Sequence, residues 1–206
     1  MARDSNCNWH TEAVFCLTKP SAAEIVGTVS AAIALQPRTS RFLLLSGGLK
    51  AQKLPFLFSH DYSRTCIGHG ELAFRIAASA FERWSQFDLG WVQVANPSAP
   101  MNVGQIVAVE AYTFGLWSLN LSQIVEVERT PTSLGFVYAT TAMHVEEGEE
   151  RFLLRLDPED GSVWYELEAV SRPQDNFAWL GLPFTRAFQH KFAGDSHRRM
   201  REAVLS

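Results

Sequence analysis

The sequence has little cysteine and no long apolar run. Its three cysteines, Cys7, Cys16 and Cys66, are an odd number, widely spaced and without a C-x-x-C pair, so we expect neither a disulfide framework nor a zinc site. The N-terminus is too polar for a signal-peptide core, and no apolar run approaches the roughly 20 residues that cross a bilayer. These absences predict reduced cysteines, no membrane span and a cytoplasmic location.

An excess of positive charge is absent as well. The net charge is −4, which gives no long-range attraction for nucleic acid or anionic lipid. The one dense basic cluster is Arg198, Arg199 and Arg201. Cations near the end of a helix compensate its dipole, and we interpret the cluster in that way rather than as a phosphate site. We therefore expect no nucleic-acid partner.

The patterns of common catalytic and metal centres are also missing. The six histidines show no H-x-H or H-E-x-x-H spacing, so neither a metal nor a cofactor is predicted. Asp195, Ser196 and His197 are consecutive, and helical neighbours point about 100° apart, so these three cannot converge as a hydrolytic triad. Gly68-His69-Gly70 lacks the third glycine of a dinucleotide fingerprint and is interpreted as a turn.

The composition is that of a globular protein. Hydrophobic residues make up 47% and charged residues 19% of the 206 positions, which is enough apolar surface for one main core. Residues 1–58 are expected to be an N-terminal extension with one helix, packed on a main domain that spans residues 59–206. In the extension, Ser21 suits a helix N-cap, and Glu24 completes a capping box.

A second helix is predicted after Gly70. Leu72, Ile76, Ala77, Ala80, Phe81 and Trp84 recur at three- and four-residue steps, with charged and polar residues between them. That spacing predicts one buried face.

From Trp91 onward the hydrophobic period changes to two, which is typical of strands. Five segments alternate in this way: Gln105 to Tyr112, Leu121 to Arg129, Leu134 to Thr140, Glu149 to Leu156 and Ser162 to Val170. Short connections without helices between them favour antiparallel hairpins, and Asp157 to Gly161 is the best turn signal.

A sheet with one apolar face needs a cover, and the C-terminal segment can supply it. Leu180, Phe184, Phe188 and Phe192 form a four-step row that predicts a long helix with one apolar side. Gly194 within that helix indicates either a close approach of another group or a neutral surface position. The fold class expected is α+β, with a curved antiparallel sheet wrapped around a long C-terminal helix.

Several short motifs occur in an order that resembles one uncharacterised family, the domain of unknown function nineteen-ninety, found in bacteria and plants. The motifs are Asp61-Tyr62-Ser63-Arg64, Gly68-His69-Gly70, Arg83-Trp84, Phe87-Asp88-Leu89-Gly90-Trp91-Val92, Gly115-Leu116-Trp117-Ser118-Leu119-Asn120, Gly148-Glu149-Glu150-Arg151-Phe152, Ser162-Val163-Trp164-Tyr165-Glu166 and Phe192-Ala193-Gly194-Asp195-Ser196. The similarity runs from about Leu54 to the C-terminus, and is weaker around Lys19 to Glu24.

That family resembles the START-like, or SRPBCC, helix-grip superfamily. The resemblance implies a strongly bent antiparallel sheet that grips the C-terminal helix, often around an apolar cavity. It implies no particular chemistry, because the superfamily includes lipid carriers, hormone receptors, cyclases and oxygenase domains.

Twelve residues are candidates for the lining of such a cavity. They are aromatic side chains, and polar side chains among them, that fall where strands or the helix face inward: Tyr112, Trp117, Asn120, Phe136, Tyr138, His144, Glu150, Tyr165, Arg172, Phe184, Phe188 and Phe192. Two interpretations stay open, since the aromatic residues would serve equally well as a packed core. Glu149 and Glu150 alternate across their strand, so one faces inward and needs a cation such as Arg172 or a proton, unless both are solvated.

The leading functional hypothesis is a binding module for a small apolar or amphipathic ligand, monomeric or weakly dimeric by default. A second hypothesis is a small cofactor-free enzyme of the cyclase, dehydratase or hydrolase type, in which Tyr138, His144 or Glu150 transfers a proton. A third is an interaction domain with a filled core and a working surface outside.

Overall fold

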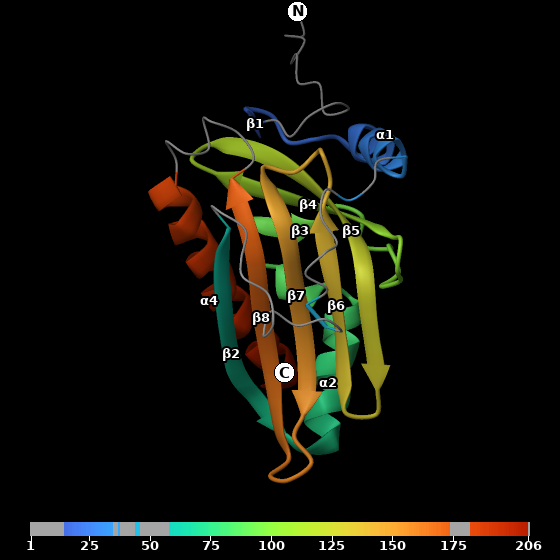
Figure 1. Ribbon diagram of the computed structural model, residues 1–206, viewed down its shortest axis with the longest axis vertical. Coiled ribbons are helices and arrows are strands. Elements are labelled where there is room, and N and C mark those ends of the chain that lie inside the picture. Colours follow the sequence, from blue (N-terminus) through green and yellow to red (C-terminus); the bar gives the residue numbers. More distant parts are fainter. Residues whose placement is uncertain (1–14, 35–36, 38–43, 46–57, 174–181, 206) are drawn as a thin grey trace, which may run out of the picture.

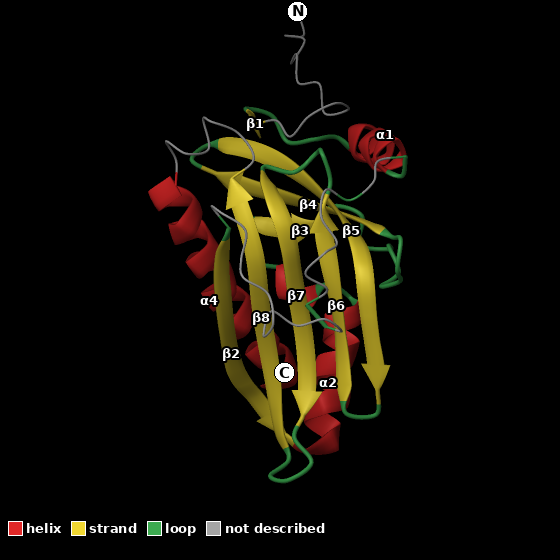
Figure 2. Ribbon diagram, viewed as in Figure 1, coloured by secondary structure: helices red, strands yellow, loops and turns green. Residues whose placement is uncertain are grey.

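Short turns join most strands of the protein directly, so strands that are neighbours in sequence are neighbours in the sheet. A computed structural model of the chain describes residues 15–34, 37, 44–45, 58–173 and 182–205. Its eight strands form one antiparallel sheet in the order β2-β8-β7-β6-β5-β4-β3, with β1 paired to β5 (Figure 2). The strands are β1 (Phe15–Cys16), β2 (Ser59–His69), β3 (Val92–Val94), β4 (Ile106–Thr113), β5 (Leu116–Thr130), β6 (Ser133–Thr140), β7 (Glu146–Leu156) and β8 (Ser162–Pro173).

Three α-helices and one short 3-10 helix complete the described chain. They are α1 (Ala22–Ala32), α2 (Gly70–Glu82), η2 (Ser85–Phe87) and α4 (Leu182–Leu205). Helices α2 and α4 lie on the same side of the sheet, while α1 lies at one end of the molecule near β1 (Figure 1). The predicted fold class, an α+β protein in which a curved antiparallel sheet grips the C-terminal helix, is confirmed.

The hairpin between β7 and β8 closes where the sequence predicts. Gly161 donates its backbone N–H to the Asp157 carbonyl at 2.9 Å and has a φ of +73°, which glycine adopts without strain. The pairing register places Phe152 opposite Leu167 and Leu154 opposite Tyr165 on the inner face. The alternation predicted for these two strands is therefore confirmed.

The sheet is curved by irregular pairing. The register shifts between Ile124 and Glu126, where β5 pairs with β6, and between Cys66 and Gly68, where β2 pairs with β8. An extra residue in one strand bends that strand and increases its twist. These shifts allow the long strands to wrap around the helices instead of forming a flat layer.

Strand β2 was not predicted, and the turn expected at Gly68-His69-Gly70 is wrong. Gly68 and His69 end β2, and Gly70 begins α2 directly, with its N–H donated to the Gly161 carbonyl at 2.7 Å. The Asp61-Tyr62-Ser63-Arg64 segment has few apolar residues, because β2 is an edge strand with an exposed outer side. A strand of this kind has no hydrophobic alternation to detect.

Helix α1 begins as predicted, and α2 shows one difference. The Ser21 side chain accepts from the Glu24 N–H, and the Glu24 carboxylate accepts from the Ser21 N–H at 2.7 Å, which completes the capping box. In α2 the buried stripe includes Phe74 and Phe81, whereas Leu72 and Ile76 are exposed, contrary to expectation.

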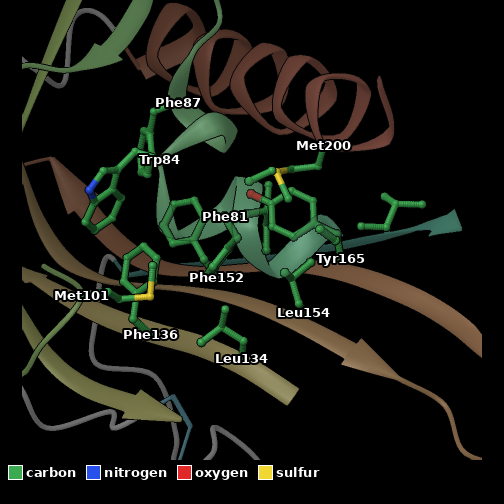
Figure 3. Packing of buried hydrophobic residues seen from close by; sticks show 14 of the residues in the cluster. Phe81, Trp84, Phe87, Met101, Leu134, Phe136, Phe152, Leu154, Tyr165 and Met200 are labelled. Carbon is green, nitrogen blue, oxygen red and sulfur yellow. The ribbon is translucent and has the colours of Figure 1, made fainter. Parts of the chain in front are cut away.

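An aromatic core fills the space between α2 and one end of the sheet. Phe81 from α2 and Trp84 just after it pack on Phe136 of β6, with ring centroids 5.6 and 5.4 Å apart. Phe136 in turn stacks on Phe152 at 5.0 Å, and Met200 of α4 joins the same cluster (Figure 3). The core is dense at this end of the sheet because large side chains come from both layers.

Much of the described part of the predicted N-terminal extension packs on the opposite, outer face of the sheet, although Phe15 of β1 borders the inner cavity. Cys16 and Ala32 share a buried cluster with Ile106 and Leu119 of β4 and β5. The Lys19 ammonium, just before α1, forms an ion pair with the buried Glu110 of β4 at 2.7 Å. The division of the chain at residue 58 stays a prediction.

The expectation of reduced cysteines is wrong at one position. Cys16 is disulfide-bonded, and its partner lies outside the described residues, whereas Cys66 is free. The cytoplasmic location inferred from reduced cysteines stays a prediction. None of the helices in the described ranges carries an apolar stretch long enough to span a membrane.

Gly194 lies in the interior of α4, and a Cβ added there would meet nothing within 4 Å. Of the two interpretations, the neutral surface position is therefore the correct one. We predict that Gly194→Ala stabilises the protein by about 1 kcal/mol, because Ala has less backbone freedom to lose in a helix. Thermal unfolding followed by circular dichroism should show a midpoint about 2–4 °C higher.

The matched control is Gly135→Ala in β6, where an added Cβ would lie 2.7 Å from the Phe152 carbonyl oxygen. That variant should be destabilised. A lower midpoint for Gly194→Ala would contradict the surface assignment.

Candidate functional site

A cavity of about 340 Å³ lies between the inner face of the sheet and the first half of α4. It begins where the aromatic core ends, because the inner-face residues there are small or polar. Ala111, Ser118, Thr140, Gly148 and Ala169 border it from consecutive neighbouring strands of the sheet, β4 to β8.

Aromatic side chains form the apolar wall of this cavity. Phe188 and Phe192 of α4 both border it, so the predicted inward row of the C-terminal helix is confirmed for these two residues. Phe192 packs on Phe87 with ring centroids 5.5 Å apart, and Phe188 packs on Trp91 at 5.8 Å. Phe184 belongs to α4, but its side chain lies outside the described residues.

A hydrogen-bonded pair on neighbouring strands provides the first polar group of the cavity. Tyr138 of β6 and Glu150 of β7 are directly opposite in the register, and the Tyr138 hydroxyl donates to the Glu150 carboxylate at 2.5 Å. Both residues border the cavity. The pair exists because the inner positions of two adjacent strands carry a donor and an acceptor side by side.

Burial sets the protonation of this pair. Burial and, less strongly, the charge of Glu146 raise the pKa of Glu150 from 4.5 to about 7, although the Tyr138 hydrogen bond acts in the opposite direction. Burial raises the pKa of Tyr138 well above its usual 10, and the neighbouring Glu150 adds to this effect. At neutral pH Tyr138 is thus a hydrogen-bond donor, and Glu150 exchanges a proton close to that pH.

A second polar group lies between β7 and α4. The Gln189 amide nitrogen donates to both carboxylate oxygens of Glu146, at 2.9 and 3.1 Å, and the Ser171 hydroxyl lies 3.4 Å from the same nitrogen. The amide oxygen of Gln189 is buried and has no hydrogen-bond partner among the described residues. This pair therefore ties α4 to β7 at the border of the cavity.

His144 and Asn120 border the cavity at the connection between β6 and β7. The Glu146 N–H donates to His144 Nδ1 at 3.0 Å, and burial lowers the pKa of His144 from 6.5 to about 4. The ring is consequently neutral at physiological pH. Asn120 accepts from the Val145 N–H at 3.4 Å and donates to the Ser118 hydroxyl at 3.1 Å. Both side chains hold the connection in place.

The structure brings six of the twelve candidate residues together at the cavity: Asn120, Tyr138, His144, Glu150, Phe188 and Phe192. Phe136 and Tyr165 face inward as predicted, but they belong to the packed aromatic core. The Tyr165 hydroxyl lies 2.8 Å from the Ser196 hydroxyl in that core. The prediction that these two border a cavity is therefore wrong, because α2 and α4 cover them.

Three other candidates lie on the outer face. Tyr112 and Trp117 are opposite each other across the β4–β5 hairpin, with ring centroids 4.9 Å apart, and Lys19 lies over Trp117. Arg172 forms an ion pair with Glu147 at 2.7 Å on the same outer side of β7 and β8. Their strand positions have the opposite parity from the residues that border the cavity, so the prediction for them is wrong.

Glu149 and Glu150 divide between the two faces. Glu150 faces inward and is paired with Tyr138, not with Arg172. Glu149 is 2% exposed on the outer face, opposite Val170 and Ala139. The alternative of two solvated carboxylates is therefore wrong.

Several residues that border the cavity are not among the twelve candidates predicted from the sequence. Asp61 and Ser63 lie on the unpredicted strand β2, and Trp91 lies in a loop. Glu146 could have been found, since it is four residues before Glu150 and therefore on the same side of an extended strand. Within the described ranges, no three His, Cys, Asp or Glu side chains lie close enough together to hold a metal ion.

The curved sheet, the gripped helix and the cavity between them define an α+β protein of the helix-grip class. Residues 46–199 match the family model described as "Domain of unknown function (DUF1990)", and the chain belongs to that family. A UPF0548 protein from Dictyostelium discoideum is 34% identical over 160 residues, which cover 72% of this chain and 74% of that relative.

Two solved structures are similar in fold. The di-domain ARO/CYC StfQ from the steffimycin biosynthetic pathway has a TM-score of 0.50 and 9% identity, and the match covers 72% of this chain and 51% of that one. TTHA0849 from Thermus thermophilus has a TM-score of 0.50 and 12% identity, and the match covers 71% of this chain and 97% of that one. At these identities the similarity shows the fold alone.

The buried Glu150 should make stability depend on pH. Its pKa is higher in the folded protein than the ordinary 4.5, so the folded state binds this proton more tightly than the unfolded chain does. The stabilising contribution is complete below pH 4.5 and is lost as the pH rises through 7. Over this window the wild-type free energy of unfolding should fall, relative to Glu150→Gln, by roughly 3 kcal/mol at about 1.4 kcal/mol per pH unit.

Urea unfolding of both proteins at a series of pH values measures this difference. Glutamine is the suitable reference because its amide oxygen still accepts from Tyr138, and the opposite contribution of His144 is common to both proteins. Parallel pH curves for the two proteins would show that Glu150 titrates normally.

Proposed function

We propose that this protein binds a small apolar or amphipathic molecule in the cavity between its sheet and α4. The observation that carries the proposal is the 340 Å³ cavity itself, which has aromatic walls and a few convergent polar groups. Small-molecule sites in proteins are concave, mostly apolar and of roughly 300–1,000 Å³. The described residues leave a cavity open, whereas the alternative of a pure interaction domain assumes a filled core. A monomer or weak dimer stays the expected state.

The cavity is suited to retaining such a molecule. Phe188 and Phe192 offer apolar surface from one side, and Ala111 and Ala169 leave room on the other. Burial of apolar surface contributes about 25 cal/mol for each Å² removed from water. The Tyr138–Glu150 pair on the cavity wall offers hydrogen-bonding groups to the polar end of such a ligand.

We predict that the neutral dye N-phenyl-1-naphthylamine binds with increased fluorescence, and that Ala169→Phe weakens this binding about tenfold, or about 1.4 kcal/mol. Ala169 borders the cavity opposite Glu150, so the added ring would occupy the space that the dye needs. Titration of the dye into each purified protein gives the dissociation constants.

The matched control is Ala31→Phe, which adds the same ring at an exposed position of α1. Its affinity for the dye should equal that of the wild type. Native mass spectrometry after incubation with a lipid extract gives an independent measurement. Equal dye affinities for Ala169→Phe and Ala31→Phe, together with an unliganded mass, would rule out the cavity as the binding site.

A second candidate function is a cofactor-free enzyme, and one observation favours it. The Tyr138–Glu150 pair borders the cavity, and the pKa of Glu150, raised to about 7 mainly by burial, is close to the value that suits a general acid or base at neutral pH. His144, with its pKa lowered to about 4 by burial, is the weaker candidate because it stays neutral in this range.

For this candidate we predict that Glu150 titrates near pH 7 in a carboxyl-detected NMR experiment, with the resonance assigned by its loss in Glu150→Gln. Tyr138→Phe should raise the pKa of Glu150 further, since the hydroxyl hydrogen bond stabilises the charged carboxylate. A pKa near the ordinary 4.5 would remove Glu150 from consideration as an acid–base group.

A further inference from the structure

Three large apolar side chains project into solvent beside the cavity. Phe15 borders the cavity and is 54% exposed, so the cavity approaches the surface of the molecule at this residue. Leu17, just beyond β1, is 82% exposed, and Phe114, in the turn between β4 and β5, is 74% exposed. We call these three residues the apolar rim. Large apolar side chains that gather at one place on a surface mark an interaction site.

Separate segments of the chain bring the apolar rim together. Strand β1 pairs with the beginning of β5, with Phe15 opposite Ser118, and the antiparallel direction leads Leu17 toward the turn between β4 and β5. The Phe114 ring packs on Phe188 of α4, with centroids 5.1 Å apart, and Phe188 borders the cavity. Strand β1, this turn and the first turns of α4 lie at the same end of the molecule (Figure 1).

The backbone at Phe114 is strained. Phe114 and Gly115 alone connect Thr113 to Leu116, and their φ angles are +53° and +81°. Two-residue turns of this kind prefer Asn-Gly, because the left-handed region is unfavourable for a residue with a bulky side chain. The chain therefore keeps an aromatic ring where it costs stability and where most of the ring stays exposed. Strain of this kind is typical of functional positions.

The charges beside the apolar rim are arranged with the cations outward. Lys19, two residues after Leu17, is half-exposed, whereas its ion-pair partner Glu110 is buried. Lys191, in the first half of α4, is likewise half-exposed and pairs with the largely buried Asp195. Lysine side chains at a membrane surface lay their apolar stems beside lipid and keep the ammonium at the headgroups. Both positions therefore suit contact with lipid phosphates.

We propose that the apolar rim inserts into the surface of a lipid bilayer, with the ammonium groups of Lys19 and Lys191 at the level of the lipid phosphates. Side chains that project singly from a turn and from a strand end can each enter lipid, whereas a protein partner would need a matching hollow for each. The net charge of −4 gives no long-range attraction, so insertion of the apolar side chains drives the contact. A cavity beside such a contact can exchange amphipathic molecules with the bilayer.

Sedimentation of the purified full chain with sucrose-loaded phosphatidylcholine vesicles tests the proposal. The fraction of wild-type protein in the pellet should rise with lipid concentration. Leu17→Asp should weaken this partitioning roughly tenfold, or about 1.4 kcal/mol, because a carboxylate cannot enter the apolar part of the bilayer. Wild-type protein that stays in the supernatant at every lipid concentration would overturn the proposal.

The matched control is Leu205→Asp, which makes the same change at a leucine that is 78% exposed at the last residue of α4. It should partition as the wild type does. Equal losses in Leu17→Asp and Leu205→Asp would show that the protein responds to added charge wherever it lies, and would refute insertion of the apolar rim.

Phe114→Asn separates insertion from folding. Asn tolerates the left-handed conformation, so the thermal unfolding midpoint should not fall, while partitioning to phosphatidylcholine should weaken by roughly the same tenfold factor. A merely structural role for Phe114 would not produce weaker binding by an equally stable protein. Partitioning equal to that of the wild type would contradict insertion of the turn.

Other occupants of the apolar rim would give different results. If a second copy covers it, analytical ultracentrifugation will show a wild-type dimer that Leu17→Asp dissociates, and the vesicles will bind no protein. If the contact is purely electrostatic, binding will require phosphatidylserine in the vesicles. Either result would overturn the proposal. The dye titration of the cavity contains no vesicles, so ligand binding and membrane binding can fail independently.

Discussion

The fold depends on α4 closing the inner face of the sheet. This inner face carries large apolar residues such as Phe136, Phe152 and Tyr165 near α2, and smaller or polar residues near the start of α4. Helix α2 covers one end and α4 spans the length, so the two helices bury what a single layer would leave in water. Removal of this surface from water is the main term that holds strands and helices together.

The cavity follows from a change in side-chain size along that inner face. Near α2 the facing residues are large, and Phe81, Phe136 and Phe152 fill the space completely. Toward the start of α4 the sheet carries Gly148 and Ala169 instead, and the backbone of α4 cannot approach more closely because Phe188 and Phe192 stand between. The same strands therefore carry large residues at the end that forms the core and small residues at the end that leaves the cavity open.

The sequence predicted the fold better than the site. The fold follows from local sequence patterns, whereas the site depends on which face of a strand each side chain occupies. Capping at Ser21, the alternation of Phe152 and Leu154 and the turn at Gly161 are local signals, and each is confirmed. Trp117 and Asn120 were both placed in the cavity although they are three residues apart in one strand. Two such residues face opposite sides of a regular strand.

Other features could not be predicted from local patterns. Whether an inward aromatic residue also borders the cavity depends on what covers it: Phe136 and Tyr138 both belong to the buried core cluster, but only Tyr138 reaches the cavity. Strand β2 escaped detection because its inner positions, such as Asp61 and Ser63, are as polar as its outer ones, which leaves no hydrophobic alternation. The raised pKa of Glu150 comes from burial, which only the assembled sheet and helix provide.

The hydrogen bonds between Gln189 and Glu146 join the covering helix to the sheet at the border of the cavity. A small molecule that hydrogen-bonds to the Glu146 oxygen atoms would compete with Gln189, which holds the first turns of α4 against the sheet. If a small molecule binds as proposed, its uptake and release would be coupled to the local opening of this helix, and α4 would be held differently in the full and the empty protein.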